Sequence, residues 1–225
     1  MRDPEVSVVI PVYNEGAAIV GCLRRILREV MSPCEILVVH DMPDDTTVAH
    51  ARPVVAADPR VRLVLNTYGP GPANAIRYGI DTARSPVCVV TMADGCDDPQ
   101  QIDTLARLVD RGVVVAAASR YMPGGQQVGG PRIKRLLSRL AGRSRTGFEI
   151  GLELTAKAAR LGLPVAEIPT IWLDRRLGQS RFDLWRFLPG YLKWYFAAFG
   201  RRPNVVDPSR AEGAEVPADA YVPAP

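Results

Sequence analysis

Three carboxylates follow a short apolar run in the middle of the chain. Residues 87–90 read Val-Cys-Val-Val, and Asp94, Asp97 and Asp98 come soon after them. A short apolar run that ends in turn residues is typical of a buried strand, and ligands of open α/β sheets bind beyond the carboxyl ends of the strands. Because clustered acids repel one another, they suit a Mg²⁺ or Mn²⁺ ion shared with a ligand's phosphates. Asp94 and Asp97 are the expected metal ligands.

The same acids have a simpler interpretation. Asp98 and Pro99 have the residue types found at the N-cap and first position of a helix. The acids would then form an Asp-rich turn that begins the next helix. Acidic turns are far commoner than metal sites, so the cluster alone favours the turn. The other motifs of the chain shift the balance towards the metal site.

A second group of polar residues lies on a glycine-containing loop near the end of the chain. Arg175, Ser180 and Arg181 offer two guanidinium groups and a hydroxyl, which suit phosphate recognition. A solvated basic loop is the alternative. A phosphate monoester is already anionic near neutral pH, so it would react without a strong general base. This agrees with the two histidines, His40 and His50, neither of which stands in an obvious base position.

Strand and helix patterns alternate through the first half of the chain. Strands are expected at residues 6–10, 35–39, 61–65, 87–90 and 113–117, and helices at 16–30, 46–57, 73–83 and 99–110. The second helix carries Pro53, which we expect to interrupt it. The alternation predicts an α/β fold with a mostly parallel sheet flanked by helices. No Gly-x-Gly-x-x-Gly follows the first strand, which argues against a dinucleotide-binding dehydrogenase.

The second half has a different pattern. A glycine-rich loop is expected at residues 121–131, helices at 133–140 and 148–161, and an extended segment at 165–173. Residues 182–199 are rich in aromatic side chains and flanked by basic ones, and Pro189 divides them. This composition fits either an interfacial pair of short helices at a membrane surface or aromatics packed on the sheet as core. Residues 201–225 are rich in Pro, Ala and acids and predict a disordered tail.

Composition sets few limits. The 225 residues carry a net charge of +4, which permits a phosphate-bearing ligand or an anionic membrane surface, and we expect no nucleic acid partner. The four cysteines have no zinc spacing. No signal peptide precedes the first strand, so we expect a cytoplasmic location. No apolar run approaches the about 20 residues of a membrane-spanning helix.

Five segments, in order, resemble the inverting GT-A glycosyltransferases of the large family that includes dolichol-phosphate mannose synthase. They are Pro-Val-Tyr-Asn-Glu at residues 11–15, Val-Val-His-Asp at 38–41, the Gly-containing segment 66–79, the acid cluster after residue 90, and Arg-Arg-Leu-Gly-Gln-Ser-Arg at 175–181. The last segment matches the Arg-x-x-Gly-x-Ser-Arg/Lys motif of the polyprenyl-phosphate branch. The resemblance covers roughly residues 6–199.

The resemblance implies a GT-A fold and a specific reaction. A hexose would pass, with inversion, from a nucleotide-diphosphate sugar to a polyprenyl- or dolichyl-phosphate-type acceptor, with a divalent cation as cofactor. It implies one domain over residues 1–200, with a donor half at about 1–120 and a shortened acceptor half at about 121–200. A lipid-linked acceptor would place the protein on the inner face of the cytoplasmic membrane.

The resemblance also assigns roles to residues of this chain. Asp94, Asp97 and Arg175 are the expected catalytic residues, Asp94 and Asp97 through the metal. The donor-binding residues would be Pro11, Tyr13, Glu15, Asp41 and Arg77. The acceptor phosphate would bind to Arg175, Ser180 and Arg181.

The chain departs from the family's motifs at three places. His40 stands where the family has the first of two acids. Aligned on the proline that follows, the family's Asp-x-Asp acids fall on Ala93 and Gly95, so Asp94 and Asp97 would substitute by a shifted register. Between residues 139 and 148 the family carries some tens of residues that close the acceptor side, and this chain lacks them. The chain is therefore either an active transferase with a reduced acceptor site or a degenerate, weakly active or inactive nucleotide-sugar-binding relative.

Overall fold

A four-stranded parallel sheet forms the centre of the first half. The computed structural model describes residues 3–128 and 149–173. Strands lie in the order β3-β2-β1-β4, and all neighbours are parallel. The strands are β1 (Val6–Val12), β2 (Cys34–His40), β3 (Val61–Leu65) and β4 (Cys88–Val90). They alternate with α1 (Ala18–Glu29), α2 (Thr46–Ala57), α3 (Pro72–Thr82) and α4 (Gln101–Asp110). The predicted fold class is confirmed.

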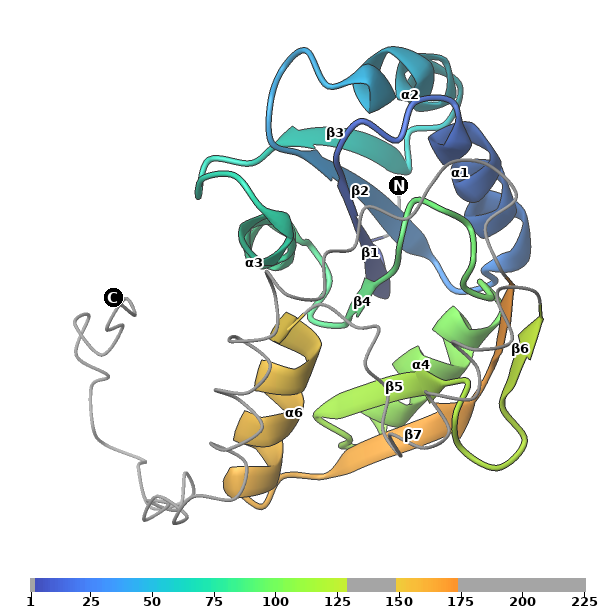
Figure 1. The fold of residues 1–225 in the computed structure, drawn as a ribbon, viewed down its shortest axis with the longest axis vertical. Helices are drawn as coiled ribbons and strands as arrows, with labels where there is room; N and C mark the ends of the chain where they lie inside the picture. The colour runs from blue at the N-terminus through green and yellow to red at the C-terminus, as the bar shows by residue number, and fades with distance from the viewer. Residues whose placement is uncertain (1–2, 129–148, 174–225) are drawn as a thin grey trace.

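Helices cover both faces of this sheet (Figure 1). Val8 and Ile10 of β1 belong to the larger apolar cluster, which includes residues of α1, α2 and α4. Val9 points to the opposite face, where its cluster includes Ala75 of α3. Every residue of β1 and β2 is buried, because helices pack on both sides of these central strands. Because both faces of these strands are buried, the strands appear in the sequence as continuous apolar runs.

Gly79 allows α3 to lie close against the sheet. An added Cβ at this position would overlap Val9 and lie 3.1 Å from Val39 Cγ2. Both valines belong to rigid, fully buried strands, so they have little room to move. The glycine is required by this close approach.

We expect Gly79→Ala to destabilise the protein by about 1–3 kcal/mol, the usual cost of overpacking a core. Gly21, in α1, is the matched control, since an added Cβ there meets no atom within 4 Å. Gly21→Ala should instead stabilise the protein by up to about 1 kcal/mol through helix propensity. Urea unfolding of both variants measures the difference. Equal free energies of unfolding would contradict the close packing of α3.

The second half forms two small parallel pairs of strands. β5 (Val115–Ser119) pairs with β7 (Val165–Pro169), and β6 (Gln126–Val128) pairs with β8 (Ile171–Leu173). α6 (Glu149–Arg160) lies beside β5 and β7 (Figure 1). The fifth strand of the alternating pattern therefore does not extend the main sheet. The extended segment at 165–173 is confirmed, and it forms β7 and β8.

Most predicted elements agree with the structure to within two residues. α2 differs in one respect, because Pro53 lies inside a continuous helix. The buried residues Ala51 and Val54 on either side of it hold the helix against the sheet, and this packing outweighs the hydrogen bond that proline cannot make. The expected elements at residues 133–140 and 182–199 and the tail at 201–225 lie outside the described residues.

Among residues 3–128 and 149–173, no helix has the length and apolar character to cross a bilayer.

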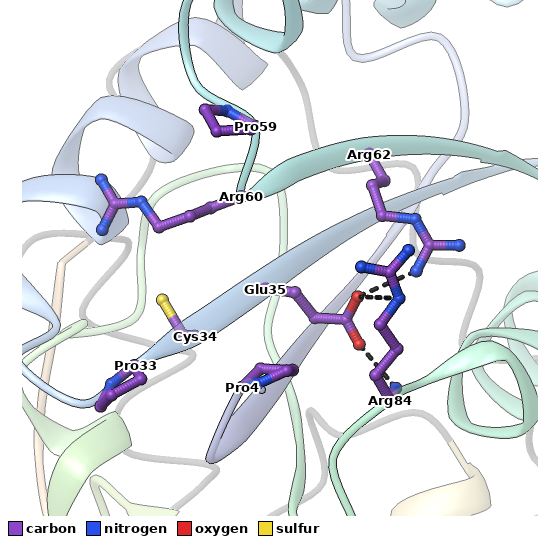
Figure 2. A pocket seen from close by; sticks show the side chains of 8 residues that line it. All are labelled: Pro4, Pro33, Cys34, Glu35, Pro59, Arg60, Arg62 and Arg84. Carbon is purple, nitrogen blue, oxygen red and sulfur yellow. Dashed lines mark hydrogen bonds and ion pairs between the residues drawn. The ribbon is translucent and has the colours of Figure 1, made fainter. Parts of the chain in front are cut away.

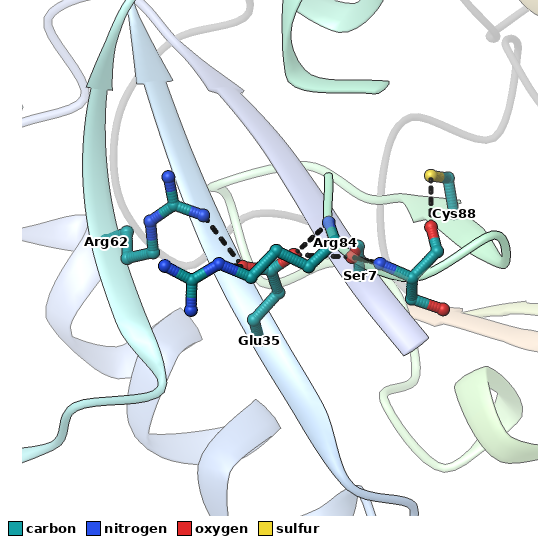
Figure 3. Close-up of polar contacts among 6 residues, drawn as sticks. Ser7, Glu35, Arg62, Arg84 and Cys88 are labelled. Carbon is teal, nitrogen blue, oxygen red and sulfur yellow. Dashed lines mark hydrogen bonds and ion pairs between the residues drawn. The ribbon is translucent and has the colours of Figure 1, made fainter. Parts of the chain in front are cut away.

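A polar cluster holds the amino ends of the strands together (Figure 3). Glu35 of β2 is buried at its centre. Its Oε1 accepts hydrogen bonds from the Ser7 hydroxyl at 2.7 Å and the Arg84 backbone N–H at 2.6 Å. Its Oε2 accepts from the Arg62 guanidinium at 2.9 Å. Burial by itself would raise the pKa of the Glu35 carboxyl, but these hydrogen bonds outweigh burial and hold the pKa below its ordinary value.

This cluster lines a pocket of about 160 Å³ at the edge of the sheet opposite the strands' carboxyl ends (Figure 2). Arg62 and Arg84 turn towards Glu35, whereas Arg60 points away and pairs with Asp58 at 2.8 Å. Arg62 and Arg84 therefore pair with Glu35 inside the pocket, whereas the partner of Arg60 lies outside the lining. We assign Glu35 to stability.

Glu35→Gln is expected to lower the free energy of unfolding by about 1–3 kcal/mol near neutral pH, because buried hydrogen bonds to a charged group are lost. The folded-state pKa is depressed, so the carboxylate stabilises fully above the unfolded pKa of about 4.3. That contribution is lost as the pH falls through the lower folded pKa. The difference between wild type and variant should shrink in acid, as followed by thermal unfolding. Glu5→Gln, at an exposed position, should show no such difference, and a constant gap across pH would contradict the assignment.

Candidate functional site

The parallel sheet brings the predicted donor-side motifs to one edge. Its strands all end at this edge, and the loops that follow them carry Tyr13, Asp41, Asn66 and Asp94 in turn. In the order β3-β2-β1-β4, β2 and β3 lie on one side of β1, and β4 lies on its other side. Such a switch point forms the ligand crevice of open α/β sheets. It lies between the loop after β1 and the acid loop after β4.

Asp97 is anchored in the loop after β4. Its Oδ2 accepts hydrogen bonds from the Thr91 hydroxyl at 2.9 Å and from the Met92 backbone N–H at 3.3 Å. The residue as a whole is exposed, but burial of its carboxyl group is the main effect that raises the pKa of Asp97, and the Asp94 charge raises this pKa further. A cation beside the carboxyl would favour its charged form and so oppose both effects on the pKa.

A cation that is shared with a phosphate would suit a pair of carboxylates such as Asp94 and Asp97. Within residues 3–128 and 149–173, no group of three or more His, Cys, Asp or Glu side chains is arranged to hold a metal ion. Mg²⁺ commonly binds one or two carboxylates and takes its other ligands from water and substrate phosphates. Asp94 and Asp97 would therefore hold the ion only in part, and a bound diphosphate would complete it.

The acid loop, which follows β4, contains the predicted turn at Asp98, but α4 begins two residues later than expected. The Asp98 carboxylate accepts a hydrogen bond from the Gln100 backbone N–H at 3.1 Å. The N-cap of α4 is Gln100, with no side-chain cap bond, and the helix begins at Gln101. Asp98 thus forms a turn before the helix, and Pro99 is not its first residue. The turn and the metal interpretations concern different acids and are compatible.

Other elements hold the acid loop in place. Arg25 of α1 donates to the Gly95 carbonyl at 2.9 Å, and the Asp94 carboxylate accepts from the Cys96 backbone N–H at 3.0 Å. The Leu173 backbone N–H, in β8, donates to the Cys96 carbonyl at 3.0 Å. The loop with the acids is therefore bonded directly to β8, the last described strand.

Asp41 shapes the neighbouring loop between β3 and α3. Its Oδ1 accepts from the Asn66 side-chain amide and its Oδ2 from the Gly71 backbone N–H, both at 2.8 Å. Asn66 also donates to the Gly69 carbonyl at 2.7 Å. Each carboxylate oxygen has a second lone pair, so these bonds are compatible with a contact to a nucleotide base. That contact stays a prediction.

The loop after β1 presents the other predicted donor residues. Pro11 is buried inside β1, opposite Val39 of β2, so it can form only the wall of a site. Tyr13 is 54% exposed, and Glu15 is half-buried. Pro11 thus lies at the end of β1, and Tyr13 and Glu15 lie in the loop that follows it.

The remaining predicted residues lie elsewhere. The Arg77 guanidinium, on α3, pairs with Glu153 of α6 at 3.1 Å, and Glu153 also pairs with Lys157 at 2.6 Å. The donor role of Arg77 stays a prediction. Arg175, Ser180 and Arg181 lie outside the described residues.

Arg120 is a further candidate for the site, and the sequence reasoning missed it. It follows β5 directly, and its guanidinium lies 4.3 Å from the centre of the Trp172 ring and 4.8 Å from that of Tyr121. Its positive charge lowers the pKa of Asp97, against the larger opposite effect of burial. Its position directly after β5 could have indicated it, because basic residues at strand ends are candidates for binding a phosphate.

A sequence profile of glycosyl transferase family 2 matches residues 7–164. The chain belongs to this family. The match runs from β1 to the residue before β7 and includes both sides of the crevice. The protein is thus a glycosyltransferase, and the resemblance found in its motifs is confirmed.

Two curated relatives align over most of this glycosyltransferase. It is 28% identical to the undecaprenyl-phosphate mannosyltransferase of Micrococcus luteus, with 79% of this chain and 87% of the relative covered. It is 29% identical to the polyprenol monophosphomannose synthase of Mycolicibacterium smegmatis, with 78% of this chain and 80% of the relative covered.

Solved structures share the GT-A fold. The mannosyltransferase PcManGT of Pyrobaculum calidifontis, solved with GDP-Man and Mn²⁺, superposes with a TM-score of 0.63 at 20% identity, over 90% of this chain and 67% of that one. The glucosyl-3-phosphoglycerate synthase of Mycobacterium tuberculosis, solved with Mn²⁺ and UDP, gives a TM-score of 0.59 at 17% identity, over 89% and 82% of the two chains.

Proposed function

We propose that this glycosyltransferase moves a hexose, with inversion, from a nucleotide-diphosphate sugar to a polyprenyl-phosphate-type acceptor. The observation that carries the proposal is that Asp94 and Asp97 follow β4, whereas Tyr13 and Glu15 follow its parallel neighbour β1, so both loops lie at the same edge of the sheet. The names of the two curated relatives support a lipid-phosphate acceptor. The Mn²⁺ and nucleotides of the two solved structures support a cation-dependent donor site.

In this proposal the residues divide the work between donor and acceptor. Asp94 and Asp97 hold Mg²⁺ or Mn²⁺, which neutralises the departing diphosphate. Tyr13, Glu15 and Asp41 bind the nucleoside. The acceptor's phosphate oxygen is already anionic, so it attacks the sugar without a general base.

The acceptor side is proposed to depend on Arg175, Ser180 and Arg181, which orient the lipid-linked phosphate. Arg120 would add positive charge near Asp97. A phosphate on a polyprenol lies at a membrane surface, so we propose that the enzyme works on the inner face of the cytoplasmic membrane. Co-sedimentation with anionic vesicles, at low and high salt, tests this location.

A weakly active or inactive nucleotide-sugar-binding protein is the second candidate, and one observation favours it. The alignment with the Micrococcus luteus relative extends over 215 positions but includes only 79% of the 225 residues of this chain. The relative therefore has residues within the aligned region that this chain lacks. This supports the expected shortening of the acceptor half between residues 139 and 148.

Turnover assays separate the two candidates. Purified protein is incubated with Mn²⁺ and either GDP-mannose or UDP-glucose, with and without polyprenyl phosphate. Transfer of the sugar to polyprenyl phosphate supports the enzyme. Binding of a nucleotide without transfer supports the second candidate, and the lack of both would contradict the proposal.

A further inference from the structure

We propose that Asp45 is a positioning residue that fixes the loop after β1 in the conformation that receives the donor. The inference rests on the proposed function, because it takes Tyr13 and Glu15 as donor-binding residues. Asp45 itself follows β2 and belongs to neither the metal site nor the predicted donor contacts. Its effect would pass through the backbone of the neighbouring loop.

Asp45 uses its two carboxylate oxygens for two different elements. Oδ1 accepts from the Thr47 backbone N–H at 2.8 Å, which makes Asp45 the N-cap of α2. Oδ2 accepts from the Asn14 backbone N–H at 3.0 Å, in the loop after β1. The residue is 2% exposed. A helix cap needs only one of these oxygens, so the second bond serves the loop.

Two further hydrogen bonds join the same pair of segments. The Asn14 side-chain oxygen accepts from the Thr46 backbone N–H at 3.1 Å. The Thr47 hydroxyl oxygen accepts from the Glu15 backbone N–H at 3.0 Å. Thr47 is completely buried, so this contact is shielded from water. Three bonds therefore tie two consecutive residues of the loop to the first turn of α2, and we call this group the loop clamp.

The loop clamp holds a backbone conformation that would otherwise be costly. Asn14 has a φ of +53°, and among the described residues it is the one non-glycine residue with a positive φ. Such conformations persist only where the surroundings fix them. Both the backbone N–H and the side chain of Asn14 belong to the clamp. Because Asn14 lies between Tyr13 and Glu15, the clamp sets where both candidate donor ligands point.

The physical consequence is preorganisation of the donor site. A loop that is already ordered loses less conformational entropy when its ligand binds. Loosening the clamp should therefore weaken nucleotide affinity in the ground state and the transition state alike. Such a uniform loss raises KM and leaves kcat nearly unchanged.

Asp45→Asn tests the clamp while it preserves the cap. Asn caps helices as well as Asp, but its amide has one oxygen, so it cannot accept from both Thr47 and Asn14. With Mn²⁺ present, we expect the dissociation constants of GDP and UDP, measured by calorimetry, to rise about tenfold, as for the loss of a hydrogen bond to a charged group. Asp58→Asn is the matched control, because Asp58 lies at the other end of α2 and binds Arg60. It should leave nucleotide affinity unchanged.

A second pair of variants tests the bond to Glu15. Thr47→Val removes the hydroxyl at nearly constant volume, whereas Thr47→Ser keeps it. We expect Thr47→Val to raise the dissociation constants of GDP and UDP about fivefold to tenfold. Thr47→Ser, which keeps the hydroxyl, should bind them within about twofold of wild type. If Thr47 had a purely structural role, the dissociation constant would rise only in variants whose melting temperature falls. The rate of donor hydrolysis is measured as well, and we expect Thr47→Val to raise KM without lowering kcat.

The outcomes separate this inference from the proposed function. If the wild type binds a nucleotide and both Asp45→Asn and Thr47→Val bind it equally well, the loop clamp has no positioning role. A fall of kcat with unchanged KM in these variants would also contradict the positioning role. If the wild type itself binds neither GDP nor UDP with Mn²⁺, the proposed function fails, and this inference fails with it.

Discussion

Replacing Asp97 with Asn is expected to weaken metal-dependent binding of the nucleotide donor by about tenfold or more, a loss typical of damage to a metal site. Asp97 is the best-anchored acid of the loop, held by Thr91 and Met92 through Oδ2. Asparagine keeps the size of the side chain but lacks the negative charge that a divalent cation requires. Asp94→Asn should have a similar effect. Calorimetric titration with Mn²⁺ measures metal binding, and a following titration with GDP or UDP measures nucleotide binding.

The control for these variants lies on the next helix. Asp110 is exposed at the end of α4, and Asp110→Asn should leave metal and donor affinity unchanged. The fold of each variant is checked by its melting temperature. If donor affinity in Asp94→Asn and Asp97→Asn depends on Mn²⁺ as it does in the wild type, the assignment of the metal ligands is wrong.

Restoring the missing acceptor-side segment should have the second large effect. We expect that a chimera with the corresponding segment of the Micrococcus luteus relative, inserted between residues 139 and 148, transfers sugar to polyprenyl phosphate at least about tenfold faster. Positioning of the acceptor contributes strongly to rates of this kind. The dissociation constant of the donor should stay within about twofold, because the donor loops belong to the other half of the chain.

An inserted linker of the same length, rich in glycine and serine, is the control for the chimera. Such a linker is flexible and brings no acceptor-binding side chains. Only the relative's segment should raise the acceptor-dependent rate. If the unmodified chain already transfers sugar as fast as the chimera, the shortened acceptor half is complete as it stands.

The elements of the first half could be predicted because their signals are local. Continuous apolar runs identified β1 and β2, whose residues are buried on both faces. The helices were indicated by apolar faces and by the turns between elements. Strand pairing is not local, and this explains why β5 was expected beside the main sheet. Its partner β7 lies beyond α6, and no pattern within β5 indicates that partner.

The candidate site was predictable in its residue types but not in its contacts. The acids after β4 and the loop after β1 were located from motifs and from the rule that strands end at the ligand edge. The bonds of Asp41 to Asn66 and Gly71 depend on how two loops fold together, which the sequence does not indicate. Arg120 was missed for the same reason, since Trp172 approaches it from a distant segment.

The separate pairing of β5 and β6 affects how the chain is synthesised. Proteins emerge from the ribosome from the amino end, so the four described strands of the main sheet are complete once Val90 has been made. β5 and β6 must wait for β7 and β8, which begin at Val165 and Ile171. Unpaired strands readily pair with other chains and aggregate. Recombinant fragments that stop before Val165 would expose these strands permanently, so soluble production requires a fragment that extends at least through β8.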